Sequence, residues 1–402
     1  MTLITEAKIR KILDSRGRAT VEVEIAGKGF RGRCAAPSGA STGAHEVIAL
    51  PKEGLEAAMR RFKKEIAPAL VGMDAAEQAA IDQRLHEIDR TPDFSRIGGN
   101  VATAVSLAAV RAAADALRIP LWRYLGGIIP VEMPCPLGNV IGGGKHALGG
   151  THIQEFLALA QGESFSEGAF ANAAVHRAVR EIYVERCPSA TLGRGDEGAW
   201  VLPIEDDEAL SLLSDACERA AATTGAEIGI GLDVAASALF SRGVYRYGKL
   251  ARKPKEQIAY MEKIAGEHGI MVLEDPLHEE DFEGFAELTD RVGDECLIVG
   301  DDLFVTNYER LEKGIECGAG NAILVKPNQI GTLTDVLRTV RLAAIGGYET
   351  IVSHRSGETT DDTIAHLALA IGSIAIKTGA VGGERTAKLN ELIRIEEALH
   401  GG

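Results

Sequence analysis

Several short apolar runs in the second half of the chain end in residues that could do chemistry. EIGIGLD ends at Asp233, GIMVLED reaches Glu274, and CLIVGDD reaches Asp301. Three converging carboxylates would repel one another unless a cation joined them. Carboxylate oxygens with no interleaved Cys or His favour Mg²⁺ or Mn²⁺ over zinc or copper. The pattern therefore predicts a divalent-metal site, with helix caps or salt bridges as the alternative use of these residues.

Later runs of the same kind end in basic residues. NAILVK ends at Lys326 and SIAIK at Lys377. A lysine that faces a divalent metal has a lowered pKa, and such a lysine can act as a general base near neutrality. Between these runs, ETIVSHRS supplies His354, Arg355 and Ser356. An arginine fork beside a hydroxyl suits a phosphate group.

Two acidic clusters lie earlier in the chain. HIQEF contains Gln154 and Glu155, and GRGDEG contains Glu197. If Glu155 and Glu197 meet, one of them should hold a proton at neutral pH, and a protonated carboxyl group can assist a leaving hydroxide. A solvated acidic turn is the alternative for GDEG. Together with a metal and a lysine base, these groups fit proton abstraction beside a carboxylate, followed by loss of a β-hydroxyl.

The stretch AAPSGASTGAHE, residues 35–46, is small and uncharged between Pro37 and His45. Such a segment can be a flexible surface loop. It can also be a mobile lid that brings hydroxyl and amide groups to an anionic ligand. The segment alone does not decide between these uses.

The elements that must position these residues follow a regular rhythm. The strand-like runs from Asp233 onward recur at roughly 23 to 41 residues, which brackets the ~30 residues of a βα unit in a (β/α)₈ barrel. Such a barrel gathers strand-end residues at one rim, although a doubly wound open sheet also places ligands at strand ends. We predict an α/β fold in which a (β/α)₈-type barrel domain, residues 126–402, follows an α+β capping domain, residues 1–125. The capping domain should begin with a β-hairpin around Gly27, Lys28 and Gly29, followed by helices.

Composition narrows the function classes. The formal net charge of −15 argues against non-specific binding of nucleic acid or anionic membranes. The 6 cysteines form no CxxC pair, which suits a reducing compartment. We see no signal-peptide pattern, no apolar run of the roughly 18 residues that a membrane helix needs, no GxGxxG fingerprint and no P-loop. We therefore expect a cytoplasmic protein without a membrane span.

Many of these stretches together resemble the enolase family over nearly the whole chain. The matching segments are ILDSRGRATVEVEI, PSGASTGAHE, GKHALGGTHIQEF, GDEG, LDVAAS, EDPL, GDDLFVTN, LVKPNQIGTLTD, VSHRSGETTDDTIAHLA, IKTGA and KLNELIRIEEAL. The resemblance implies Mg²⁺-dependent dehydration of 2-phospho-D-glycerate to phosphoenolpyruvate by a hydro-lyase. It also implies a homo-oligomer, either a dimer or an octamer.

The resemblance assigns metal ligands. It implies that Asp233, Glu274 and Asp301 bind a first Mg²⁺ that holds the substrate carboxylate. Ser41 would bind a second Mg²⁺ when substrate is present and the PSGASTG segment closes as a lid.

The resemblance also implies the acid–base roles. Lys326 would be the base at C2, and Glu197 would be the acid for the C3 hydroxyl, with Glu155 beside it. Lys377 would contact the substrate carboxylate, and Gln154 would steady the acidic pair.

A third group would bind the phosphate of the substrate. His354, Arg355 and Ser356 would frame it, and His146 would close onto the site from a loop.

Some positions depart from the family's usual pattern. Gly142 and Trp200 stand near expected site residues, and Gly382 and Gly383 replace part of an Arg-Ser-Glu-Arg type of segment. These departures leave open an enolase-like paralogue that acts on a related phosphorylated or phosphonate-bearing glycerate. A racemase or cycloisomerase on the same barrel would not need the phosphate-binding residues. A non-enzymatic interaction protein would not need the acid, base and metal set.

Overall fold

The N-terminal part of the molecule is built on a three-stranded antiparallel sheet. The computed structural model describes residues 2–39, 43–128 and 132–400. The sheet contains β1 (Ile4–Leu13), β2 (Ala19–Gly27) and β3 (Phe30–Ala35), in the order β1-β2-β3. Gly27 pairs with Phe30 across the turn Lys28–Gly29, and Gly29 has a φ of 83°, a conformation that favours glycine. The predicted hairpin is thus confirmed.

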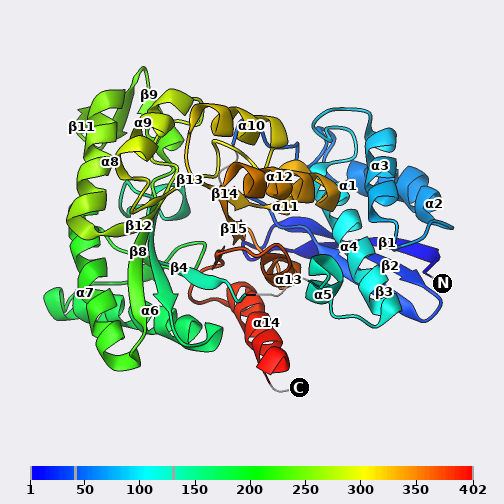
Figure 1. Cartoon of the computed structure of the whole chain (residues 1–402), viewed down its shortest axis with the longest axis horizontal. Coiled ribbons are helices and arrows are strands. Elements are labelled where there is room, and N and C mark those ends of the chain that lie inside the picture. The colour runs from blue at the N-terminus through cyan, green and yellow to red at the C-terminus, as the bar shows by residue number, and fades with distance from the viewer. Residues whose placement is uncertain (1, 40–42, 129–131, 401–402) are drawn as a thin grey trace.

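Helices cover one face of this sheet (Figure 1). They are α1 (Leu55–Arg61), the π-helical turn η1 (Phe62–Ile66), α2 (Ala67–Leu70), α3 (Gln78–Asp89), α4 (Gly99–Leu117) and α5 (Leu121–Gly126). The Ala-rich α4 lies directly against the sheet, because a Cβ atom at Gly32 of β3 would lie only 2.1 Å from the backbone nitrogen of Ala112. Within the described ranges, α4 is the one helix long and apolar enough to cross a membrane, and 78% of that stretch is buried, as in a core helix.

The remainder of the chain forms a closed barrel. Strand β16 pairs with β4, which closes the sheet and excludes the open-sheet alternative. The barrel strands are β4 (Cys135–Gly142), β5 (Glu155–Gln161), β8 (Glu227–Asp233), β12 (Ile270–Glu274), β13 (Leu297–Gly300), β14 (Ala322–Val325), β15 (Glu349–Ser353) and β16 (Ala375–Lys377). Their inward side chains, among them Leu157, Val299 and Leu324, fill the barrel interior as a packed core.

The barrel differs from a uniform βα repeat at β5, which runs antiparallel to both β4 and β8. The Gly-rich connection between β4 and β5 carries only the 3₁₀ turn η2 (Gly144–His146), whereas a parallel crossover needs a dozen or more residues, usually a helix. The reversal has a direct consequence for the site. Glu155 begins β5 instead of ending it, and it lies opposite Asp233 at the same rim.

Helices surround the barrel (Figure 1). They are α6 (Phe165–Arg186), α7 (Asp206–Thr224), α8 (Pro254–His268), α9 (Phe282–Val292), α10 (Tyr308–Cys317), α11 (Pro327–Ile330), α12 (Leu333–Gly346), α13 (Thr363–Ala370) and α14 (Gly383–His400). Smaller elements at the periphery are β6 (Gly193–Arg194), β7 (Trp200–Val201), η3 (Ala236–Ala238), β9 (Phe240–Ser241), β10 (Val244–Tyr247) and β11 (Leu250–Arg252).

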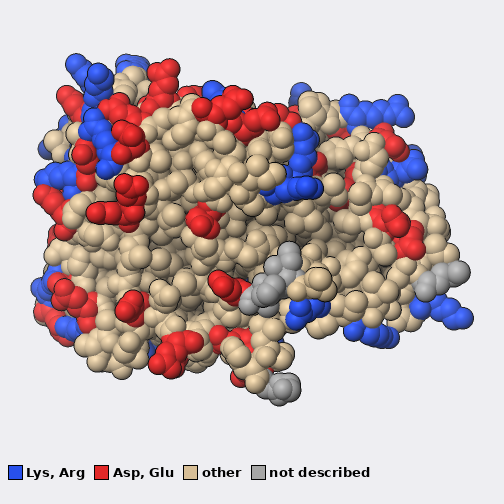
Figure 2. Space-filling view, viewed as in Figure 1, with Lys and Arg blue, Asp and Glu red and all other residues tan. Residues whose placement is uncertain are grey.

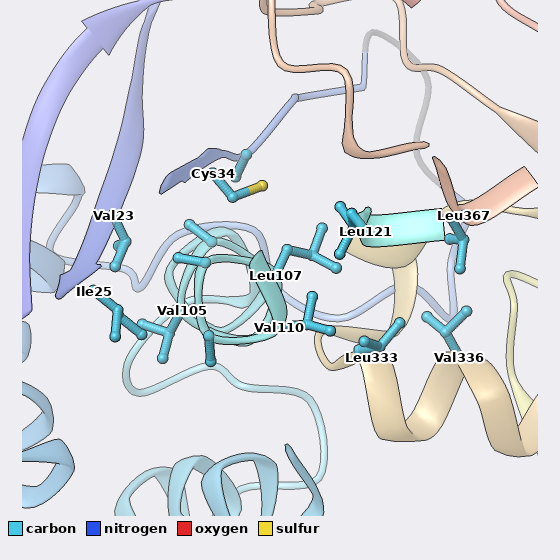
Figure 3. Packing of buried hydrophobic residues seen from close by; sticks show 14 of the residues in the cluster. Val23, Ile25, Cys34, Val105, Leu107, Val110, Leu121, Leu333, Val336 and Leu367 are labelled. Atoms are coloured by element: carbon cyan, nitrogen blue, oxygen red, sulfur yellow. The ribbon is translucent and has the colours of Figure 1, made fainter. Parts of the chain in front are cut away.

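One hydrophobic cluster joins the two parts of the molecule. Figure 3 shows Val105, Leu107 and Val110 of α4 with Leu333 and Val336 of α12 in the same packed layer. Because this apolar cluster spans the N-terminal sheet, α4 and the barrel helices, the N-terminal part is held firmly against the barrel. The boundary between residues 125 and 126 remains a prediction.

The close approach of α4 to the sheet gives a test of the packing. Gly32→Ala should lower the free energy of unfolding by more than about 2 kcal/mol, because the new methyl group meets helix backbone that cannot move aside alone. Gly266→Ala in α8 is the matched control, because outside its own stretch of helix no described atom lies within 4 Å of its Cβ position, and it should be neutral or up to about 1 kcal/mol stabilising. Chemical denaturation measures both, and equal stability of the two variants would contradict the packing.

Candidate active site

The strand ends bring the predicted charged residues together at one rim of the barrel. Lys377, at the end of β16, lies with its Nζ 2.5 Å from Glu274 Oε2 and 3.2 Å from Asp233 Oδ2. Lys326, after β14, lies 2.5 Å from Asp301 Oδ2. A pocket at this rim is lined by Gly39, His146, Gln154, Glu155, Glu197, Asp233, Asp301, Lys326, Ser353, His354, Arg355, Ser356 and Lys377.

Of the three carboxylates predicted to bind metal, Asp233 and Glu274 are buried at this rim and Asp301 is half-buried beside them. Glu274 is fully buried, and its Oε1 has no hydrogen-bond partner among the described residues. Burial and the neighbouring Asp233 raise the pKa of Glu274 well above its usual range. An all-oxygen donor set with an unpartnered buried oxygen fits a hard divalent cation such as Mg²⁺.

The protein's own carboxylates raise the pKa values of the two lysines, whereas a bound metal ion would lower them. Burial alone would lower the pKa of Lys326, but the adjacent carboxylates, Asp301 foremost and then Glu274, raise it. Burial likewise opposes the charges of Asp233 and Glu155, yet the pKa of Lys377 is raised well above its usual value. The lowered lysine pKa expected from the sequence therefore requires a bound cation that neutralises these carboxylates.

The predicted acidic pair is formed, and a histidine bridges it. His146 Nδ1 lies 3.2 Å from Glu155 Oε1 and 3.7 Å from Glu197 Oε1. Burial and the Glu197 carboxylate raise the pKa of Glu155. Burial alone would raise the pKa of Glu197, but the rings of His354 and His146 lower it well below its usual value. Of the two carboxyl groups, Glu155 is therefore the one that holds a proton more readily in this arrangement.

Two amide side chains hold the carboxylates from the sides. Gln154 was expected to steady the acidic pair, but its Nε2 instead donates to Asp233 Oδ2 at 3.2 Å. The contact with the pair belongs to Asn139, whose Nδ2 donates to Glu197 Oε2 at 3.1 Å. Asn139 lies within β4 between buried neighbours, so nothing in the surrounding sequence marks it as a site residue.

The side of the pocket predicted to bind phosphate is organised by a buried ion pair. Arg355 donates from Nη2 to Glu46 Oε1 at 2.9 Å and from Nη1 to Glu46 Oε2 at 3.0 Å. It also donates to Asn328 Oδ1 at 3.0 Å. Glu46 closes the AAPSGASTGAHE stretch, so this stretch is tied to the arginine expected to bind phosphate. Ser41, the predicted ligand of a second metal, lies outside the described residues.

Other residues that support the site were not predicted from the sequence. Asp275 accepts hydrogen bonds from the backbone N–H groups of Asp301 and Asp302 at 3.0 and 2.8 Å. Gln329 donates to Asp301 Oδ1 at 2.8 Å. Arg385, which is fully buried, reaches His354 from α14. The sequence could have pointed to Asp275, because it directly follows the strand-end residue Glu274. No comparable sequence pattern marks Gln329 or Arg385.

The departures noted in the sequence lie outside the pocket lining. Trp200 stacks on His176 of α6, with ring centroids 5.0 Å apart, and its Nε1 donates to the His176 carbonyl at 2.8 Å. A Cβ at Gly142 would make ordinary contact with Ala199 at 3.5 Å. Gly382 has a φ of 106°, which glycine adopts readily at the start of α14. None of these three residues adds bulk to the pocket.

A closed barrel that gathers carboxylates, lysines and an arginine at one rim is typical of a metal-dependent acid–base enzyme. Comparison of the sequence with known protein families leads to the same class of protein. Residues 4–125 match the enolase N-terminal domain, and residues 130–402 match the enolase C-terminal TIM barrel domain. The chain belongs to the enolase family, the hydro-lyases that convert 2-phosphoglycerate to phosphoenolpyruvate. The predicted family, fold and hydro-lyase activity are confirmed.

Curated relatives match along their whole length. The enolase of Natronomonas pharaonis is 54% identical over 400 residues, which cover 98% of this chain and 99% of the relative. The enolase of Halorubrum lacusprofundi is 52% identical over 402 residues, 99% of each chain. The enolase of Methanothermobacter thermautotrophicus is 50% identical over 404 residues, 99% of this chain and 97% of the relative.

The Glu46–Arg355 pair gives a test of how the pocket is held. Glu46→Gln should lower the free energy of unfolding by about 3–5 kcal/mol, because it removes the negative charge from the buried Glu46–Arg355 ion pair. Glu53→Gln removes an exposed partner of Arg61 and serves as the control, with a change below about 1 kcal/mol. Denaturant titration compares the two, and a Glu46 variant as stable as the control would contradict the role of this pair.

Proposed function

We propose that this chain dehydrates 2-phospho-D-glycerate with Lys326 as the base and Glu197 as the acid. The observation that carries this assignment is that both groups line one pocket, Lys326 from the end of β14 and Glu197 from the turn between β6 and β7, where Glu197 lies close to His146 and Glu155. Loss of a β-hydroxyl needs a proton acceptor at C2 and a proton donor at C3. The pocket holds one residue for each of these two tasks.

Asp233, Glu274 and Asp301 would hold the first Mg²⁺, and Ser41 would contribute to a second. The ions, when bound, would stabilise the negative charge that builds on the substrate carboxylate as C2 loses its proton. With Asp301 serving as a metal ligand, its pull on Lys326 weakens. Lys326 can then lose its proton and act as a base.

The chain's own side chains then divide the work. The C2 proton passes to Nζ of Lys326. Glu197, after it has taken up a proton, gives that proton to the C3 hydroxyl, which leaves as water. Lys377 binds the substrate carboxylate, while His354, Arg355 and Ser356 bind the phosphate and His146 closes the site. The phosphate dianion adds negative charge beside Glu197, which raises its pKa toward that of a proton donor.

The AAPSGASTGAHE stretch, residues 35–46, is part of the same proposal as a lid over the pocket. Ser38, at its base, pairs with Gly357 through mutual backbone hydrogen bonds of 2.7 and 2.8 Å. Gly357 directly follows the predicted phosphate-binding residues 354–356. The loop is therefore anchored beside the phosphate side of the pocket, which supports its use as a lid that excludes water.

The proposal also includes the oligomeric state, the cellular location and the partners of the enzyme. We infer a homo-oligomer, as the family resemblance implies, which light scattering on the purified chain tests directly. A cytoplasmic location is supported by six free cysteines. The net charge of −15 disfavours nucleic acid as a partner, and acidic side chains are spread over the barrel half of the face in Figure 2.

Exchange of the C2 hydrogen with deuterated solvent tests the base. Lys326→Ala should abolish this exchange, because no other group is assigned to remove the C2 proton. Lys313→Ala, an exposed lysine over the Phe282 ring, is the control and should exchange as the wild type does. Mass spectrometry of recovered 2-phosphoglycerate gives the readout. Exchange that survived in Lys326→Ala would show that the base is wrongly assigned.

The acid is tested with the same substrate. Glu197→Gln should stop formation of phosphoenolpyruvate and leave C2 exchange measurable, because the amide cannot give a proton to the leaving hydroxyl. Absorbance of the enol product and deuterium content are measured together. Normal product formation in this variant would contradict the assignment. A wild-type enzyme that turned over only a phosphonate-bearing or C3-substituted glycerate would instead indicate a specialised paralogue.

A further inference from the structure

Arg385 is a buried cation whose hydrogen bonds to described residues all go to segments that form the site. It lies in the first turn of α14, and its side chain has no solvent exposure. A charged side chain is kept in such a position only where hydrogen bonds compensate for lost hydration. Its nearest carboxylate is Glu384, whose Oε1 lies 3.5 Å from Nε. Its hydrogen bonds go instead to backbone carbonyls and to one imidazole nitrogen.

Three of these hydrogen bonds hold backbone on both sides of the pocket. Arg385 donates to the carbonyl oxygens of Arg355 at 2.5 Å, Ser356 at 2.8 Å and Asp196 at 3.3 Å. The first two carbonyls belong to the loop assigned to the phosphate, and the third precedes Glu197 directly. One rigid guanidinium therefore sets the separation between the phosphate loop and the acid.

The fourth hydrogen bond fixes the state of a histidine. Nη1 of Arg385 lies 2.9 Å from Nδ1 of His354. A guanidinium can only donate, so Nδ1 must accept with its lone pair, and the ring proton must sit on Nε2. Burial and the Arg385 charge also lower the pKa of His354 to about 3, against the opposing charge of Glu197. His354 is therefore neutral at physiological pH.

The free side of this imidazole faces the pocket. Nε2 of His354 is buried, lies 3.4 Å from Glu197 Oε1, and makes no hydrogen bond to a described residue. His354 also lines the pocket. A buried N–H group without a partner is costly unless a ligand completes it. The ligand expected here is an oxygen of the anionic substrate.

We propose that Arg385 is a positioning residue that locks His354 as the neutral Nε2–H tautomer and presents this N–H to the substrate. Arg385 does not touch the substrate itself and acts through His354 and the two loops. This inference rests on the proposed function for the identity of the substrate oxygen, but not for the tautomer, which is a property of the free protein.

Nitrogen-15 NMR of the ring nitrogens of the wild-type protein tests the tautomer without any substrate. The His354 signals are assigned by their loss in His354→Gln. We expect an unprotonated Nδ1 and a protonated Nε2 at pH 7. A protonated Nδ1, or a doubly protonated ring, would overturn the proposal whatever the activity of the enzyme. Failure of the function assignment would leave this spectrum unchanged, so the two outcomes are distinguishable.

Variants of Arg385 test the consequence for catalysis. Arg385→Met keeps a long side chain without donors and should lower kcat/KM by about 10–100-fold, the range seen when an outer support of a site is lost. Its His354 spectrum should show mixed tautomers. Arg385→Lys can still donate a hydrogen bond, so it should recover part of the activity and part of the population of the Nε2–H tautomer.

Arg394→Met is the matched control on the same helix, because Arg394 is exposed and its hydrogen bonds to described residues go to Glu391. It should leave kcat/KM and the His354 spectrum as in the wild type. If Arg385→Met does not fold, Arg385→Lys and the wild-type spectrum still decide the question. A folded Arg385→Met with wild-type kcat/KM and an unchanged His354 spectrum would contradict the proposal.

Discussion

The site depends on the burial of many charges of both signs at one rim of the barrel. Lys377 contacts carboxylates from three different strands, Glu155, Asp233 and Glu274, within 3.4 Å. Buried charges are tolerated only where opposite charges and hydrogen bonds compensate for lost hydration. The strand ends, the reversed β5 and the supporting amides all follow from the need to satisfy this cluster. A divalent cation fits the same requirement, because the carboxylates outnumber the ammonium groups that face them.

The rim also explains why the two lysines are held differently. Lys377 is surrounded by carboxylates on several sides, so it remains an ammonium that can bind an anionic substrate group. Lys326 depends mainly on Asp301, so its charge state responds to whatever else Asp301 binds. The difference between a binding lysine and a base thus arises from the number of carboxylates around each one.

Much of this arrangement could be predicted from the sequence, because strand-end chemistry is a local signal. Asp233, Glu274, Asp301 and Lys326 each follow an apolar run, and the barrel rule alone brings them together. The direction of β5 was not predicted, because it depends on a connection too short and Gly-rich for a helix. Glu155 reaches the rim by this reversal and not by ending a strand.

Supporting contacts were beyond the reach of sequence patterns. Arg385 meets His354 across 31 positions, and Glu46 meets Arg355 across 309, so only the closed fold brings them together. The same distance in sequence explains why Trp200 looked like a change at the site although its ring packs on α6. Residues that touch reacting groups are visible as motifs, whereas residues that hold them in place are visible only in three dimensions.

The most direct test of the account is the formation of enol product from 2-phosphoglycerate and Mg²⁺ by the purified chain, followed by ultraviolet absorbance. The account predicts turnover with kcat in the usual range of roughly 1–10³ s⁻¹. A chelator should abolish this turnover, and added Mg²⁺ should restore it. Absent turnover, or turnover indifferent to the chelator, would contradict the claim that the charged rim is completed by a divalent cation for this reaction.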